Sequence, residues 1–124
     1  MAGIWENVLN ALEQDPTYQG MFRLMEQYKT DTAAEIAGKD GEILTRSYET
    51  YAEMIRSACG SLQRSGRFRS GDTVGLIYDT CMDWPVLFWG ILMAGGTPLL
   101  LNPSMDPENI KSILKEAGAS SVCF

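Results

Sequence analysis

The chain has 124 residues, 45% of them hydrophobic and 21% charged, which suits one small globular domain. Its sixteen acidic and ten basic residues give a formal net charge of −6, and this balance argues against a nucleic-acid-binding protein. There is no histidine, and the cysteines are three and widely spaced, so the usual zinc sites and a Cys/His catalytic pair are excluded. We expect reduced thiols in a cytoplasmic protein.

The first thirty residues predict two amphipathic helices. In residues 4–13 the apolar side chains recur with helical spacing, and Asp15-Pro16 then interrupts the pattern. The second run places Met21, Phe22 and Met25 on one face. Its two methionines could form an adaptable binding surface, but ordinary core packing is favoured.

Residues 31–47 predict a β-hairpin. Residues 33–37 and 43–46 form its strands, and Lys39-Asp40-Gly41 forms the turn, because Asp-Gly tolerates positive φ. Ser47 then caps a four-turn helix that Gly66 ends. The apolar face of this helix comprises Tyr48, Tyr51, Ala52, Ile55, Cys59 and Leu62.

The rest of the chain alternates strands and helices. Residues 73–78, 97–101 and 120–124 predict buried strands, and helices capped by Asp83 and Asp106 lie between them. The apolar run of residues 85–94 is too short for the ~20 residues of a membrane span, so it predicts a buried helix. The apolar, core-facing side of the last helix is formed by Ile110, Ile113, Leu114 and Ala117.

The predicted fold class is α/β, with N-terminal helices and a β-hairpin followed by a βαβαβ unit of three parallel strands. We expect residues 1–124 to form a single, incomplete domain. Within it, residues 1–30 are a helical lead-in, residues 31–47 the hairpin, and residues 48–124 the helix and the βαβαβ unit.

This succession of motifs resembles the opening of the adenylate-forming enzymes, the AMP-binding superfamily that includes the acyl-CoA synthetases. The motifs are Ser47-Tyr48-Glu49-Thr50-Tyr51-Ala52-Glu53-Met54, Gly66 to Gly71-Asp72-Thr73-Val74-Gly75-Leu76, Gly90-Ile91-Leu92-Met93-Ala94-Gly95-Gly96, Leu101-Asn102-Pro103, Asp106-Pro107-Glu108-Asn109-Ile110 and Glu116-Ala117-Gly118-Ala119. The resemblance covers residues 21–124. It departs at Thr50, where the family often has an acid, and in the loop of residues 79–84, which lacks the usual asparagine.

The resemblance implies a parent acid–thiol ligase that activates a carboxylic acid with ATP and Mg and passes the acyl group to coenzyme A. This chain has no phosphate-binding Ser/Thr/Gly-rich loop with a lysine, and in the family that loop lies further along than Phe124. Gly95-Gly96 lacks a following lysine and is better explained as a helix end. We therefore expect an inactive N-terminal fragment with no cofactor of its own, whose partner is the remainder of the parent enzyme.

Candidate ligand-binding residues follow two of the strands. Ligands of open parallel sheets gather beyond the carboxyl ends of the strands, here Tyr78-Asp79-Thr80 and Leu101-Asn102-Pro103. The resemblance implies that the loop of Leu101, Asn102 and Pro103 lies near the nucleotide end of bound coenzyme A. A simple turn at Asn102-Pro103 is the alternative.

Other residues have two interpretations. Trp84, Phe88 and Trp89 could wall an acyl pocket, but packing between helix and sheet is favoured. Asp79 and Asp83 could bind a metal, but a turn residue and a helix cap are favoured because a third ligand is lacking.

Two other functions compete with the ligase fragment: a stand-alone interaction or regulatory module, and a small flavodoxin-like binding domain. The missing phosphate loop argues against the second. A sheet that ends at Phe124 has an unpaired edge, so we expect self-association. The carboxylic acid, and the choice between coenzyme A and a carrier-protein thiol, stay open.

Overall fold

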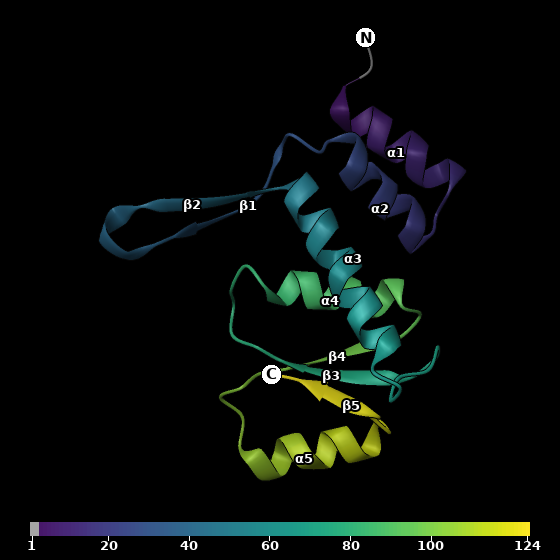
Figure 1. The fold of residues 1–124 in the computed structure, drawn as a ribbon, viewed down its shortest axis with the longest axis vertical. Helices are drawn as coiled ribbons and strands as arrows, with labels where there is room; N and C mark the ends of the chain where they lie inside the picture. Colours follow the sequence, from purple (N-terminus) through teal and green to yellow (C-terminus); the bar gives the residue numbers. More distant parts are fainter. Residues whose placement is uncertain (1–2) are drawn as a thin grey trace. The chain divides into compact units, whose positions relative to one another are not determined.

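The computed structural model describes residues 3–124 and divides into two compact units, the first ending at Glu53 and the second beginning at Met54. Figure 1 shows the elements in chain order. They are α1 (Ile4–Gln14), α2 (Tyr18–Gln27), β1 (Thr32–Ala37), the 3-10 turn η1 (Lys39–Gly41), β2 (Ile43–Ser47), α3 (Tyr48–Arg64), β3 (Thr73–Ile77), α4 (Trp84–Met93), β4 (Thr97–Leu101), α5 (Pro107–Glu116) and β5 (Ser121–Cys123).

Helices α1 and α2 of the first unit form a helical hairpin joined at Asp15-Pro16 (Figure 1). Thr17 begins α2 by accepting a hydrogen bond at its Oγ1 from the amide of Gly20, at 3.0 Å. Asp15 holds the connection from the other side, because its carboxylate accepts from Thr17 Oγ1 at 2.7 Å and is ion-paired with Arg23. The two predicted helices are confirmed.

The β-hairpin is also confirmed. Strands β1 and β2 are antiparallel, with Ala34 opposite Arg46 and Ala37 opposite Ile43. Asp40 and Gly41 have φ angles of 63° and 77°, the left-handed conformation that the Asp-Gly pair predicts.

Helix α3 begins and ends where the sequence predicts. The Oγ of Ser47 accepts from the amide of Thr50 at 3.2 Å, and Gly66 beyond the helix has a φ of 72°. Tyr51, Ala52 and Ile55 of the predicted apolar face are buried.

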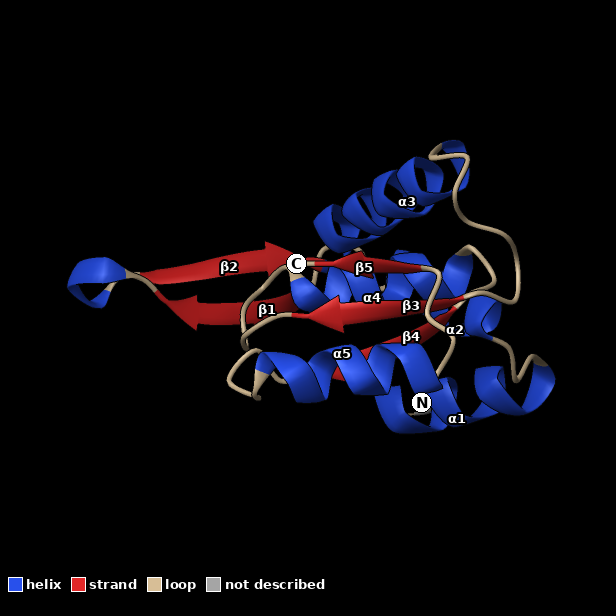
Figure 2. Cartoon of the chain, turned by 90° about the horizontal axis from the view of Figure 1, so that it is seen from below, coloured by secondary structure: helices blue, strands red, loops and turns tan. Residues whose placement is uncertain are grey.

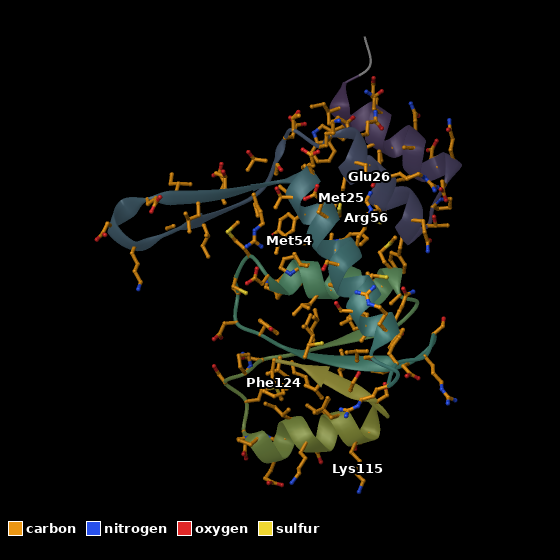
Figure 3. The ribbon with its side chains drawn as sticks, viewed as in Figure 1. Met25, Glu26, Met54, Arg56, Lys115 and Phe124 are labelled. Carbon is orange, nitrogen blue, oxygen red and sulfur yellow. The ribbon has the colours of Figure 1, made fainter. Side chains whose placement is uncertain are left out.

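The second unit contains a parallel three-stranded sheet of order β4-β3-β5, which confirms the βαβαβ unit. This sheet lies between α4 and α5 (Figure 1), and Figure 2 shows it from the side of α5. The central strand β3 carries the most deeply buried side chains of the sheet, Val74 at 0% and Leu76 at 2% exposure. Lys115 points away from the sheet on the outer side of α5 (Figure 3).

Two glycines allow close packing in this unit. A Cβ at Gly90 of α4 would lie 2.9 Å from the Cβ of Ala58 in α3, and one at Gly75 of β3 would lie 2.6 Å from Cδ2 of Leu114 in α5. Such distances are shorter than side chains normally allow. A side chain at Gly90 would therefore require α3 to shift, and one at Gly75 would require the Leu114 side chain to move.

The two caps that the sequence predicts for α4 and α5 differ in the structure. Asp106 has an extended ψ of 128°, and its carboxylate accepts from the amide of Glu108 at 3.3 Å. Asp83 has helical angles, φ −96° and ψ −29°, and its side chain makes no capping hydrogen bond. A capping side chain needs an extended backbone at its own residue, and therefore the carboxylate of Asp83 does not cap α4 as predicted.

Candidate functional site

The candidate site lies where strands β3 and β4 end. The strands are parallel and in register from Thr73 opposite Thr97 to Ile77 opposite Leu101, so their carboxyl ends are level. The chain then leaves β3 for α4 on one face of the sheet and leaves β4 for α5 on the other (Figures 1 and 2). Connections that diverge in this way leave a crevice beyond the strand ends, where α/β proteins bind ligands.

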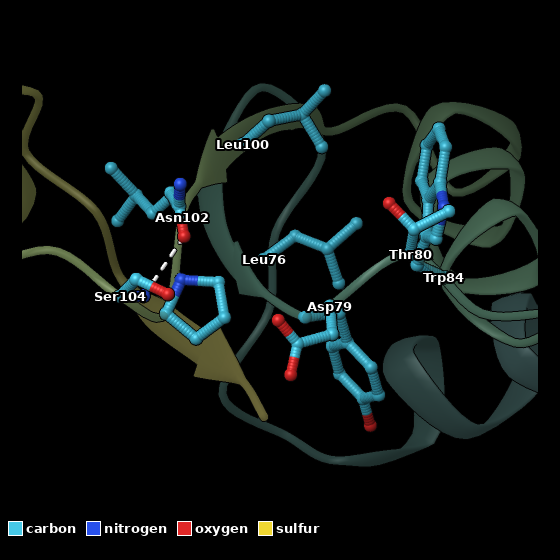
Figure 4. A pocket seen from close by; sticks show the side chains of 10 residues that line it. Leu76, Asp79, Thr80, Trp84, Leu100, Asn102 and Ser104 are labelled. Carbon is cyan, nitrogen blue, oxygen red and sulfur yellow. Dashed lines mark hydrogen bonds between the residues drawn. The ribbon is translucent and has the colours of Figure 1, made fainter.

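A cavity of about 460 Å³ occupies this crevice. It is lined by Leu76, Tyr78, Asp79, Thr80, Trp84, Leu100, Leu101, Asn102, Pro103 and Ser104. Both segments that the sequence singles out, residues 78–80 and residues 101–103, therefore line the same cavity. Figure 4 shows Asn102 and Ser104 on one side, Thr80 and Trp84 on the other, and Leu76 and Asp79 between them.

Asn102 forms the turn that leads out of β4. Its Oδ1 accepts from the amide of Ser104 at 2.8 Å (Figure 4), and its carbonyl accepts from the amide of Met105 at 3.1 Å. The turn predicted as the alternative is thus present. It uses the side-chain oxygen, so the amide NH₂ group of Asn102 is the part that can donate to a ligand.

The polar groups of the cavity are hydroxyls, an amide and one carboxylate. Asp79 is the single charged lining residue, and neither lysine nor arginine lines the cavity. Phosphate groups are bound in proteins mainly by arginine, lysine and clustered backbone amides. This lining suits uncharged hydrogen-bonding groups better than phosphates.

The three aromatic residues of α4 have different positions. Trp84 lines the cavity, whereas Phe88 and Trp89 do not. The three rings stack edge to face in sequence, with centroids 6.0 Å apart for Trp84 and Phe88 and 6.2 Å for Phe88 and Trp89. Phe88 and Trp89 therefore fit the packing interpretation. Trp84 lines this cavity, and the acyl-pocket interpretation stays a prediction.

Neither a metal site nor a reactive thiol is found at the cavity. Within residues 3–124, no three Cys, Asp or Glu side chains are grouped so that they could hold a metal ion. Burial raises the pKa of the Cys59 and Cys123 thiols, which keeps both protonated at neutral pH and weakly nucleophilic. Neither cysteine lines the cavity.

Three lining residues were not predicted from the sequence: Leu76, Leu100 and Ser104. Ser104 could have been predicted, because an asparagine such as Asn102 commonly accepts a hydrogen bond from the amide two residues later. Leu76 and Leu100 had none, since they meet only through the register of β3 and β4.

Comparison with known proteins gives the family. The sequence model of the family described as AMP-binding enzyme matches residues 22–124. The chain belongs to the AMP-binding enzyme family. This AMP-binding enzyme chain is 29% identical to the long-chain-fatty-acid–CoA ligase of Salmonella typhimurium over 106 residues, which are 85% of the chain and 18% of that ligase. It therefore spans about a fifth of the length of the curated relatives that it matches first.

Solved structures agree on the fold. The A-PCP didomain of carboxylic acid reductase from Segniliparus rugosus aligns with a TM-score of 0.78 at 16% identity, covering 93% of this AMP-binding enzyme chain and 18% of that one. The fatty acyl-adenylate ligase from L. pneumophila aligns with a TM-score of 0.76 at 19% identity, covering 86% and 19%. The α/β arrangement is thus the fold of the N-terminal part of adenylate-forming enzymes.

Proposed function

We propose that this chain is the N-terminal part of a ligase that activates a carboxylic acid with ATP and transfers the acyl group to coenzyme A. The match of the AMP-binding enzyme family over residues 22–124 carries the proposal. The fatty-acid–CoA ligase relatives support coenzyme A as the acceptor. In such a reaction the carboxylate attacks the α-phosphorus of ATP and releases pyrophosphate. The thiol then attacks the acyl carbon and releases AMP.

The 124 residues supply scaffold to this reaction and leave nucleotide chemistry to other residues of the ligase. The sequence has no glycine-rich phosphate loop with a lysine. The described residues contain no cluster of three or more Cys, Asp or Glu side chains that could hold a metal ion, and the cavity at the end of β4 lacks a basic residue. These residues do not fit ATP and magnesium, so we infer that the remainder of the enzyme binds both and is the partner of this chain.

The test is a pyrophosphate-release assay with ATP, magnesium and a panel of carboxylic acids, including long-chain fatty acids. We expect no release from the 124-residue protein. We expect release from the protein translated through a longer reading frame that continues into a phosphate loop. Turnover by the 124-residue protein would refute the scaffold assignment, and an inactive longer protein would refute the ligase.

For Leu101, Asn102 and Pro103 we propose a place beside bound coenzyme A. Their position at the carboxyl end of β4, in a cavity of about 460 Å³, supports this. Because that lining holds Asp79 and no base, we assign Asn102 to an uncharged part of the ligand. Its NH₂ group would donate to a carbonyl, ribose or adenine acceptor.

Two finer points belong to the same proposal. We infer that the protein works in the cytoplasm, since Cys59, Cys81 and Cys123 are all unbridged. Among residues 3–124, none of the helices has the length and apolar character of a membrane span.

We also infer that the isolated chain self-associates, because β4 and β5 are both edge strands of its sheet.

A further inference from the structure

The first unit contains an apolar groove that the proposed ligase chemistry does not use. Its volume is about 370 Å³. Helix α1 lines it with Ile4, Trp5, Val8 and Leu12, helix α2 with Met21, Leu24, Met25 and Tyr28, and Asp31 and Tyr48 complete it. The family match begins only at residue 22, so all of α1 lies outside it.

The apolar side chains of this groove are open to solvent. Trp5 is 79% exposed, Ile4 64% and Met21 37%. Apolar side chains gathered in one exposed groove indicate a binding surface, and methionines adapt to partners of different shape. Core packing, which the sequence favours for the methionines of α2, holds for the neighbouring Phe22, which is 7% exposed.

The charge of the protein is concentrated in the unit that carries the groove. Residues 1–53 hold ten of the sixteen acidic residues and four of the ten basic ones, a net charge of −6. Residues 54–124 hold six of each and are neutral. A field of this sign attracts cationic partners to the first unit and repels anionic ones.

Acidic residues also adjoin the groove in sequence. Asp31 lines it, and four lining residues are each followed directly by an acid, namely Glu6, Glu13, Glu26 and Glu49. Two basic residues, Arg23 and Lys29, also adjoin the lining, and Arg23 is ion-paired with Asp15.

We propose that this groove binds a basic amphipathic helix of another protein. The apolar floor would receive the apolar face of that helix, and Asp31 and the net negative charge of the first unit would attract its lysines and arginines. Helix α1 has 11 residues, about 16 Å at 1.5 Å per residue, so the groove accommodates a helix of about three turns.

Charge distinguishes this occupant from three others. A second copy would bring α1 with Glu6 and Glu13 and no base, inside a unit of the same net charge. A membrane surface and a free fatty acid are anionic at neutral pH. All three would be repelled by Asp31 and by the net negative charge of the first unit.

The test titrates the full 124-residue protein with three synthetic helical peptides. The first combines leucine on one face with lysine on the other, the second replaces lysine by glutamate, and the third scrambles the first. ¹³C-methyl NMR follows the methionines, with Met21 and Met25 in the groove and Met105 in the second unit as an internal reference. We expect saturable shifts of Met21 and Met25 for the leucine–lysine peptide alone, weakening as salt is raised.

Two lysine variants separate the groove from the overall charge. Ile4 is 64% exposed and lines the groove, whereas Ile43 is 66% exposed and lies on the hairpin outside it. Both Ile4→Lys and Ile43→Lys add one positive charge at an exposed isoleucine. We expect Ile4→Lys to raise the Kd of the leucine–lysine peptide about tenfold, because a buried apolar contact is lost and a repulsion added. We expect Ile43→Lys to change it less than about twofold.

Each other result would overturn the proposal. An equal loss of affinity in the two variants would show that the peptide is attracted by net charge alone. Binding of the glutamate peptide would show that positive charge is not required. Binding of the scrambled peptide would show that an apolar helix face is not required. Dimerisation that Ile4→Lys abolishes and Ile43→Lys does not would show that a second copy occupies the groove. Tighter binding to anionic vesicles than to the peptide would show that a membrane surface does.

Discussion

At the scale of single residues, Asn102 holds the turn after β4 and is also our candidate contact for coenzyme A. The two roles use different atoms, because Oδ1 accepts from the amide of Ser104 and the NH₂ group is the donor that we assign to the proposed ligand. Asn102→Asp keeps an oxygen for the turn and removes the donor, and Asn102→Ala removes both.

In the complete ligase we expect both variants to raise the KM for coenzyme A about 2- to 13-fold, the equivalent of one hydrogen bond worth ~0.5–1.5 kcal/mol. The kcat of the adenylation half-reaction should stay unchanged, since that step precedes coenzyme A. Steady-state kinetics would measure both values. A KM that rises in Asn102→Ala but not in Asn102→Asp would show that the residue serves only the turn.

The residues that end and begin elements were the most predictable, because each acts through its own backbone. Ser47, Gly66 and Asp106 all do what their residue type indicates. Asp83 does not, because its backbone angles are helical, and the local sequence pattern did not predict them. Most of the cavity lining beyond the strand ends was predicted, as residues 78–80 and 101–103, whereas Leu76 and Leu100 within the strands were not.

At the scale of elements, the contact between α3 and α4 depends on Gly90. A Cβ there would lie 2.9 Å from Ala58 Cβ and 3.4 Å from the amide nitrogen of Cys59, and neither atom can move without moving α3. Gly60, in α3 itself, is the matched control. The three atoms nearest to its Cβ would all belong to the guanidinium of Arg64, the closest at 2.8 Å, and this group is the end of a flexible side chain.

We expect Gly90→Ala to lower the free energy of unfolding by about 1–2 kcal/mol. The overpacking costs about 1–3 kcal/mol and outweighs a gain in helix propensity of up to about 1 kcal/mol. Gly60→Ala should raise it by up to about 1 kcal/mol, because only the propensity changes. Urea unfolding followed by circular dichroism measures both. Stabilisation by Gly90→Ala would contradict the close packing of α3 and α4.

The helical hairpin shows what a helical pattern does and does not predict. The spacing of Trp5, Val8 and Leu12 predicts an apolar face correctly. Whether that face is covered depends on which other elements reach it, and this information is tertiary. The structure leaves Trp5 79% exposed, and the groove between α1 and α2 follows from that exposure.

At the scale of the whole molecule, the parallel sheet has two open edges. In the order β4-β3-β5 only β3 is paired on both sides, and Leu100 of β4 is 54% exposed. Unpaired backbone groups next to exposed apolar side chains favour pairing with another chain, and charged side chains on an edge strand oppose it. The parallel direction of the three strands followed from the alternation of elements, but their order and the exposure of Leu100 did not.

We therefore expect the average mass of the isolated protein, measured by static light scattering, to rise with concentration. Leu100→Lys should shift the equilibrium towards monomer, because each association through β4 would bring the new charge beside the partner strand. Leu44→Lys, at a leucine of the hairpin that is 46% exposed, is the control with the same change in charge and should leave the association largely intact. A wild-type protein that stays monomeric at all concentrations would refute edge pairing. Equal effects of the two variants would assign the association to net charge.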